Sequence, residues 1–327
     1  MTRAQRVTAV FRRFGGGGSG SCPLEAAPEG ADSPTCNIPA FRGQETERIV
    51  TCGVAITRQR QAADLRGVPR TMLWKAADAN LSLLGSVHVL DQRARALCPE
   101  AERTYAMAQR VAFEHDLMAA PDLSLIENAP GNPLSRQVPT VVFGNAAKEW
   151  VNVDLEPERL EQLQPWFAAL VIGSRAAARR GIMESHGVDM MLWDRTEQDG
   201  KTRTTLEPLE QALSAFSKSP AHEQASFLDY ATNPISNLQD DIDAMVNAWH
   251  RHDASAIVRI RAHRLRMWPE CYGGAILGRN LAWMPLLLDL AADAVPTLVV
   301  VGALHCVGEQ GLPNLLANAG LRFSRVV

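Results

Sequence analysis

Two histidines in this sequence each follow an apolar segment at the same short spacing. Near the C-terminus, the β-branched run 299–301 is typical of a strand buried on both faces, and Gly302 permits a tight turn before His305. Far upstream, the apolar run 81–84 leads through the same Gly-x-x-His spacing to His88. In open α/β sheets, ligands bind at the carboxyl ends of the strands. The repeated spacing therefore predicts two imidazoles at one functional edge.

A carboxylate is predicted at the same edge. Proline and acidic residues at 99–102 are typical of the first turn of a helix, which we expect to end near Arg110. Residues 111–113 then have the pattern of a short strand, and Glu114 follows it directly. If the helices are the crossover connections of a mostly parallel sheet, His88, Glu114 and His305 are three potential ligands on one edge.

The remaining elements support an α/β fold. Apolar segments 72–75 and 81–85 flank a plausible hairpin turn at 77–80, so we expect the folded domain to begin at residue 71. Between 154 and 293 the sequence is mostly amphipathic helix. One helix is indicated by the spacing of apolar residues and a stop at Gly181: Leu160, Leu163, Trp166, Phe167 and Leu170. We predict a mostly parallel central sheet flanked by helices, with a large helical insertion in the middle of the chain.

Four further polar positions are candidates. Glu207 ends a short strand-like segment, which favours a site role. For Asp189, capping of a helix N-terminus and a site role are equally supported. Arg279 and Asn280 precede the apolar run 281–290; Arg279 supplies a fixed charged fork for a carboxylate or an oxyanion, or a structural ion pair with Glu114 or Glu207.

Other histidines and the cysteines are weaker candidates. His250 and His252 face different directions on a helix, which disfavours a metal site, and His115 is expected on the strand face opposite Glu114. The six cysteines include no C-x-x-C pair. We therefore interpret them as buried or free thiols, while a pairing of Cys98 with Cys271 in an oxidising compartment stays open.

Composition bounds the class of protein. The chain has 327 residues, 46% hydrophobic and 21% charged, with a formal net charge of -3. It has no basic block that indicates a nucleic-acid partner and needs no membrane span. Residues 1–70 include a glycine run and little apolar surface, which predicts a disordered leader before the domain 71–327. No signal peptide is seen, so the chain as written is expected in the cytoplasm, or outside it if the true start differs.

In order and type, these motifs resemble the TraB/PrgY/GumN family, which includes the Tiki proteins. The resemblance covers residues 72–327 and rests on Leu-Trp-Lys at 73–75, the Gly-x-x-His ending at His88, Glu114, Arg279-Asn280, and the terminal Gly-x-x-His-x-x-Gly-x-x-Gly-Leu, 302–312. The segment 120–152 departs from the familiar pattern, and the leader has no counterpart.

The resemblance to Tiki metalloproteases implies a metal-dependent hydrolase, most simply of peptide or related amide bonds. His88 and His305 are then metal ligands, Glu114 a third ligand or the general base, and Arg279 the electrophilic clamp, with Asn280 and Glu207 beside it. Two imidazoles and a carboxylate leave coordination positions open for water. Such mixed ligands do not choose among Mn, Co, Zn and Fe.

Two alternatives stay open. The fold also resembles that of erythromycin esterases and ChaN-like proteins, which implies a metal-independent hydrolase with a histidine general base. A regulatory protein that binds a peptide or small molecule without turnover is equally compatible, since bacterial family members are linked to pheromone shutdown and polysaccharide gene clusters. The sequence leaves the substrate and the oligomeric state undetermined.

Overall fold

The computed structural model describes residues 71–92, 97–233 and 238–326. The predicted leader, residues 1–70, lies outside them. The described chain contains one six-stranded sheet, in the order β4-β3-β5-β2-β1-β6. Its strands are β1 (Leu73–Ala76), β2 (Leu81–Ser86), β3 (Arg110–Phe113), β4 (Thr202–Thr205), β5 (Thr297–Gly302) and β6 (Phe323–Arg325).

The sheet is mostly parallel, as predicted. Strands β4, β3, β5 and β2 run parallel, whereas β1 is antiparallel to both of its neighbours, β2 and β6. The hairpin predicted from residues 72–85 is therefore confirmed. All six residues of β5 are buried, in agreement with its run of β-branched residues. Because the four parallel strands end at one edge, side chains that follow them are brought together.

Helices fill the rest of the described chain and confirm the predicted insertion. Between β2 and β3 lies α2 (Pro99–Met107), which ends three residues before the expected Arg110. Between β3 and β4 lie α3 (Leu123–Ile126), α4 (Leu134–Gln137), α5 (Thr140–Asn152), α6 (Pro157–Leu160), α7 (Pro165–Arg179), η1 (Glu184–His186) and α8 (Val188–Gln198). Between β4 and β5 lie α9 (Leu209–Ser217), α10 (Ala221–Thr232), α11 (Leu238–His250), α12 (Ala254–Met267), α13 (Pro269–Tyr272), η2 (Gly273–Gly278) and α14 (Arg279–Ala292). After β5 come α15 (Ala303–Cys306) and α16 (Leu312–Asn318).

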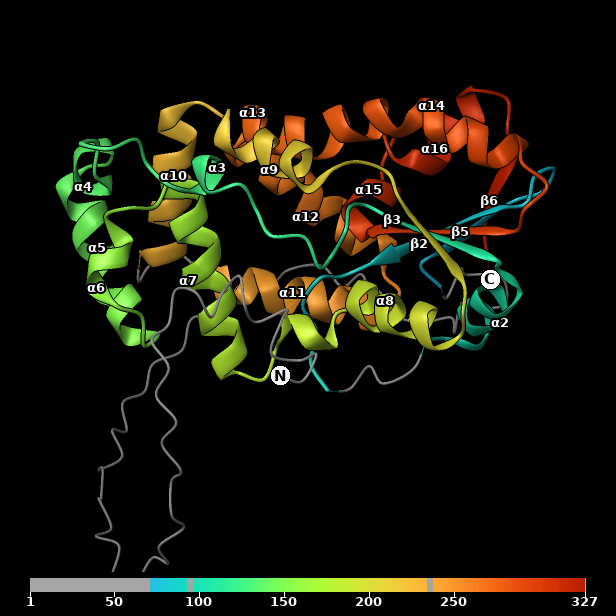
Figure 1. Cartoon of the computed structure of the whole chain (residues 1–327), viewed down its shortest axis with the longest axis horizontal. Helices are drawn as coiled ribbons and strands as arrows, with labels where there is room; N and C mark the ends of the chain where they lie inside the picture. Colours follow the sequence, from blue (N-terminus) through green and yellow to red (C-terminus); the bar gives the residue numbers. More distant parts are fainter. Residues whose placement is uncertain (1–70, 93–96, 234–237, 327) are drawn as a thin grey trace, which may run out of the picture. The chain divides into compact units, whose positions relative to one another are not determined.

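Two hydrophobic cores flank the carboxyl edge of the sheet. One joins the strands to α2, α8, α11, α14 and α16, and in Figure 1 α14 and α16 lie on one side of the strands and α8 and α11 on the other. The second core is formed by the helices from α3 through α7 together with α10 and α13. These helices lie in the part of the domain toward which the parallel strands point (Figure 1). Leu304, just past β5, packs against both cores. The carboxyl edge of the sheet therefore lies where the two cores meet.

The helix expected from the apolar spacing of 160–170 is two helices. Leu160 ends α6, and Pro165 begins α7 at its first position, where the missing N–H of proline costs no helical hydrogen bond. The apolar residues are still core: Leu160, Leu163, Trp166 and Phe167 are buried. The predicted stop is confirmed, because α7 ends at Arg179 and Gly181 has φ +80.

Arg279 and Asn280 are the first two residues of α14. They follow the π-helical turn η2 inside the continuous helix 269–292. Among the described residues, this is the one helix long and apolar enough to cross a membrane, with a mean hydropathy of 1.2, and 44% of its most apolar window is buried inside the protein. Such a helix also forms the core of many folded domains.

Cys98, Cys271 and Cys306 are free thiols. The pairing of Cys98 with Cys271 that the sequence left open is therefore not formed. Burial raises the pKa of Cys271 to about 12. A thiol with so high a pKa is a poor nucleophile at neutral pH, which favours a packing role.

Candidate functional site

The carboxyl edge of the sheet carries one polar residue after each parallel strand. Glu207 follows β4, Glu114 follows β3, His305 lies in the turn after β5, and His88 lies two residues after β2. The β3–β4 ladder continues into this edge, because the N–H of Glu207 donates to the carbonyl of Glu114 at 3.0 Å. The strand order therefore sets the order of these side chains along the edge.

The side chain of His88 contacts an aspartate of the helical segment between β3 and β4. Its Nδ1 is hydrogen-bonded to Oδ2 of Asp189, near the start of α8. The backbone docks the two segments, since the N–H of Val188 donates to the carbonyl of Val87 at 3.1 Å. The negative charge of Asp189 raises the pKa of His88 to about 9. With Nδ1 engaged, Nε2 is the free nitrogen, and the side chain is 58% exposed.

Asp189 lies in the first turn of α8 and also satisfies a backbone amide there. Its Oδ1 accepts from the N–H of Met190 at 3.0 Å, while Oδ2 contacts His88. The two interpretations that the sequence left equally supported, a carboxylate that satisfies amides at a helix N-terminus and a site contact, both describe this side chain. Such a carboxylate fixes which imidazole nitrogen carries the proton.

Arg279 bridges two buried carboxylates. Its Nη2 donates to Oε2 of Glu114 at 2.6 Å, and its Nε donates to Oε1 of Glu207 at 2.5 Å. Burial would raise the pKa of Glu114, but the charge of Arg279, acting together with the neighbouring histidines and the N–H of Gly302, outweighs burial and holds that pKa well below its usual value. Burial raises the pKa of Glu207, against the opposing charge of Arg279. The remaining nitrogen, Nη1, makes only contacts of 3.5 Å, to the carbonyl of Ala275 and to His305.

Asn280 fixes the tautomer of His305. Its Nδ2 donates to the carbonyls of His305 at 3.2 Å and Gln310 at 2.9 Å, so its Oδ1 is the acceptor that faces the ring. Nδ1 of His305 lies 2.6 Å from that oxygen and must carry the proton. Burial lowers the pKa of His305 to about 3, so the ring is neutral and Nε2 holds a lone pair. Nε2 lies 3.8 Å from Oε1 of Glu114.

The side chains of His88, Glu114 and His305 surround the end of β5. A Cβ built on Gly302 would lie 3.3 Å from Oε1 of Glu114, 3.6 Å from Nε2 of His88 and 3.7 Å from Cδ2 of His305. The N–H of Gly302 also donates to Oε1 of Glu114 at 2.6 Å. The structure thus brings together the six residues singled out in the sequence: His88, Glu114, Glu207, Arg279, Asn280 and His305.

The fit of these residues to a metal ion is limited. Both oxygens of Glu114 already have partners, and the cationic Nη1 of Arg279 lies 3.5 Å from Nε2 of His305, the lone pair a metal would need. Across the described ranges of the chain, no three or more His, Cys, Asp and Glu side chains are arranged to hold a metal. As placed, these side chains do not form a metal site, and the metal stays a prediction.

Several residues near the cluster were not predicted. The ring of Trp283 packs against the ring of His305, with 4.7 Å between the ring centroids. The Cζ of Arg279 lies 4.7 Å from the centroid of the same Trp283 ring. The position of Trp283 four residues after Arg279, on the same helix face, could have indicated it. His115 was expected on the opposite strand face, but β3 ends at Phe113, so strand alternation does not reach it. The charge of Glu114 acts on His115, whose pKa is lowered by burial.

His250 and His252 lie elsewhere. His250 ends α11 and its Nε2 lies 3.1 Å from Oδ1 of Asp91, whereas His252 is past the helix end with φ +52. The two rings pack against Trp249. These contacts support the packing role favoured from the sequence.

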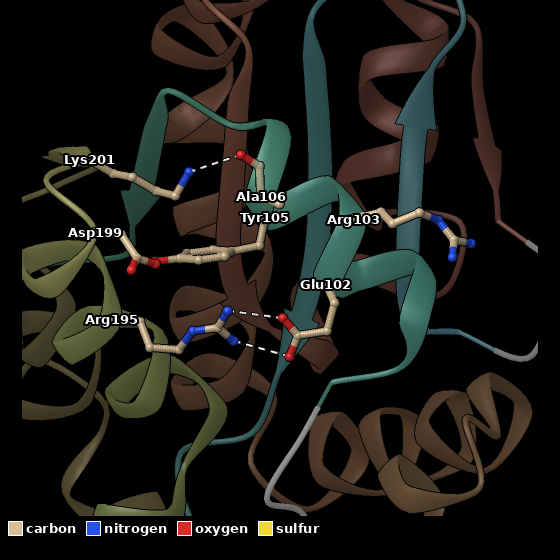
Figure 2. Close-up of a pocket in the computed structure, with 7 residues that line it drawn as sticks. All are labelled: Glu102, Arg103, Tyr105, Ala106, Arg195, Asp199 and Lys201. Atoms are coloured by element: carbon tan, nitrogen blue, oxygen red, sulfur yellow. Dashed lines mark hydrogen bonds and ion pairs between the residues drawn. The ribbon is translucent and has the colours of Figure 1, made fainter.

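Two pockets accompany the fold. One of about 420 Å³ borders the cluster, since Arg279 lines it together with residues of α9, Glu270 and Gly278. The other, of about 480 Å³, lies beside α2 and the segment before β4 (Figure 2). There Arg195 donates twice to Glu102, and Arg195 and Lys201 contact the ring of Tyr105 (Figure 2). Lys201 donates to the carbonyl of Ala106 at 3.2 Å, and Asp199 accepts from the hydroxyl of Tyr105 at 2.8 Å. These groups already have partners within the fold, which is typical of a structural surface.

The fold and edge define an α/β protein with a histidine, carboxylate and arginine cluster at the carboxyl ends of its parallel strands. The chain belongs to the TraB/PrgY/gumN family, whose model matches residues 72–325. The resemblance drawn from the motifs is therefore confirmed. Similar proteins are the uncharacterized protein YbaP of Escherichia coli (strain K12) and that of Shigella flexneri, each 24% identical over 263 residues, covering 78% of this chain and 96% of the relative. No solved structure matches the chain significantly.

Proposed function

We propose that this cluster is the active centre of a hydrolase that cleaves ester or amide bonds, including peptide bonds. The observation that carries the proposal is the pairing of His88 with Asp189. Asp189 engages Nδ1, so Nε2 faces the edge occupied by Glu114 and His305. A histidine oriented by a carboxylate is suited to take a proton from water and return it to the leaving group.

In this mechanism the neutral form of His88 removes a proton from water as the water attacks the carbonyl carbon of the substrate. Negative charge develops on the carbonyl oxygen, and a nearby donor is needed to stabilise it. Among the nitrogens of Arg279, Nη1 has the weakest existing contacts, so it is the donor assigned to this oxygen. Glu114 and Glu207 hold the guanidinium in place. The protonated His88 then donates to the leaving oxygen or nitrogen. The pocket of about 420 Å³ that Arg279 lines offers space for the acyl portion of a substrate.

Metal-assisted hydrolysis is the second candidate, carried over from the family resemblance with His88, Glu114 and His305 as ligands. One observation favours it: Asn280 turns the lone pair of Nε2 in His305 toward Glu114, as partners of metal-binding histidines do. A bound Mn, Co, Zn or Fe ion would polarise the carbonyl and acidify water. The contacts of Arg279 with Glu114 and with Nε2 of His305 argue against this arrangement, because they occupy the atoms that an ion would bind. A binding protein without turnover is the third candidate.

The test is an assay of the purified chain on fluorogenic ester and peptide substrates. One portion is stripped with EDTA and one is supplied with each metal in turn, after metal analysis of the protein as isolated. Hydrolysis that survives EDTA and is lost in His88→Ala supports the metal-free mechanism. Hydrolysis that requires an ion supports the metal. Tight peptide binding without hydrolysis, in any of these states, would contradict both enzymatic candidates.

A further inference from the structure

Arg261 is a buried cation that the proposed mechanism does not use. It lies on α12 and is 6% exposed. Its Nη1 donates to the carbonyl of Val307, two residues after His305. Within the described ranges its guanidinium forms no ion pair with a carboxylate, and burial lowers its pKa. Burying a guanidinium without a carboxylate is costly, so an apolar side chain would be expected at a position that serves packing alone.

The segment that Arg261 contacts is the turn that carries His305. Gly308 has φ +79, and a Cβ on it would lie 3.3 Å from Nη1 of Arg261. A Cβ on Gly311 would lie 2.8 Å from the carbonyl oxygen of Val307, the group that Arg261 binds. Gly308 and Gly311, the last two of the three glycines of the terminal motif, are therefore required where the guanidinium and this carbonyl pack against the turn.

The same turn is bound from the other side by Asn280. Its amide donates to the carbonyls of His305 and Gln310, which lie before and after Val307. Its Oδ1 accepts from Nδ1 of His305 and so sets the direction of the ring. Arg261 and Asn280 thus hold one short turn from α12 and α14. Release of either contact lets the turn, and the ring with it, shift.

We propose that Arg261 is a positioning residue for His305: by holding the carbonyl of Val307 it fixes the turn 302–311 in the one conformation in which Asn280 can orient the imidazole toward Glu114 and Arg279. The inference rests on the proposed function only for its effect on turnover. The geometry it concerns is present whether or not the protein is an enzyme.

The test compares Arg261→Met and Arg261→Lys with the wild type, with Arg266→Met as the matched control. Arg266 is on the same helix and is exposed, so its loss should change nothing. In protein labelled with ¹⁵N, the NMR signals of the Asn280 side-chain amide and of Nδ1–H in His305 report the turn directly. We expect both to shift or broaden in Arg261→Met, at temperatures well below its melting temperature.

Turnover gives the second readout. His305 lies 3.5 Å from Nη1 of Arg279, the proposed oxyanion donor, so a displaced ring also disturbs that donor. We therefore expect kcat to fall by about 10- to 100-fold in Arg261→Met with little change in KM, as for a misplaced group in an otherwise intact site. Arg261→Lys keeps the charge and one donor but not the planar fork, so its losses should be smaller. If Arg261→Met does not fold, Arg261→Lys decides: shifted signals with a lowered kcat support the positioning role.

Wild-type signals and wild-type kcat in a folded Arg261→Met or, failing that, in Arg261→Lys would overturn the inference. If the wild-type chain hydrolyses none of the substrates, the proposed function fails, but the NMR comparison still decides whether Arg261 holds the turn. The two failures are therefore distinguishable.

Discussion

Arg279 sits between two buried carboxylates, so its charge supports the fold as well as the proposed chemistry. Arg279→Lys keeps a charge but cannot reach Glu114 and Glu207 with a planar fork while also presenting a third nitrogen. We expect kcat to fall by about 10²-fold or more, as for the loss of one preorganised donor at an oxyanion. Single-turnover rates and melting temperatures measured on the same preparation test this.

A purely structural Arg279 would give the opposite pattern. The melting temperature would fall while the folded fraction kept its single-turnover rate. Arg279→Met provides the upper limit for the structural effect, because removal of one partner from a buried ion pair costs about 3–5 kcal/mol.

The His88–Asp189 pair should give the site a characteristic pH dependence. Asp189 raises the pKa of His88 from 6.5 to about 9, so the pair stabilises the folded state fully below pH 6.5 and loses this contribution as the pH rises through about 9. In Asp189→Asn the pKa of His88 should return toward 6.5 or lower. NMR titration of the His88 ring, in EDTA-treated protein, measures both values.

Stability should follow the same sign. The melting temperature of Asp189→Asn should lie below that of the wild type at pH 6, and the gap should narrow by pH 10. An equal gap at both pH values would show that Asp189 contributes mainly through its contact with the N–H of Met190 in the first turn of α8. If His88 is the general base, kcat/KM should also rise with pH across the range in which His88 loses its proton.

At the scale of elements, the end of β5 leaves little room beside the cluster. Gly302 has φ -52, which alanine adopts without strain, yet its Cβ would lie 3.3–3.7 Å from Glu114, His88 and His305. We expect Gly302→Ala to lower kcat/KM clearly while the melting temperature changes little. A variant with full activity would show that the space around Gly302 is not the reaction centre.

A glycine in a helix far from this edge provides the matched control. Gly144 lies in the middle of α5, and a Cβ there meets nothing within 4 Å. Gly144→Ala should stabilise the protein by about 1 kcal/mol, because alanine has the higher helix propensity, and should leave activity unchanged. Denaturant unfolding and the hydrolase assay check the two expectations.

At the scale of the whole molecule, the first and last strands of the family domain are neighbours in the sheet. The family model begins at residue 72, and the sheet order places the last strand, β6, beside the first, β1. The composition of the leader predicts few packing contacts. Deletion of residues 1–67 should therefore leave the melting temperature of the remaining chain nearly unchanged, as scanning calorimetry can show. A large drop would mean that the leader packs against the domain.

Much of the architecture could be predicted from local pattern. The β-branched run before Gly302 and the Gly-x-x-His repeats indicated buried strands, and the hairpin at 72–85 indicated an antiparallel pair. The strand order then brought the predicted polar residues to one edge. Apolar spacing was less reliable for helix continuity. It predicted one helix through Leu160 and Trp166, but Pro165 begins a new one. One continuous helix and two shorter helices can bury the same apolar side chains, so the apolar spacing does not distinguish between them.

The sequence by itself determined which residue types follow the strands, because strand and turn propensities act over a few neighbouring residues. Only the tertiary structure decided their partners. Asp189 meets His88 across about a hundred positions of chain, Arg279 divides its donors between Glu114 and Glu207, and Asn280 sets the tautomer of His305. Such contacts depend on distances and directions between elements that are far apart in sequence, and no local spacing encodes them.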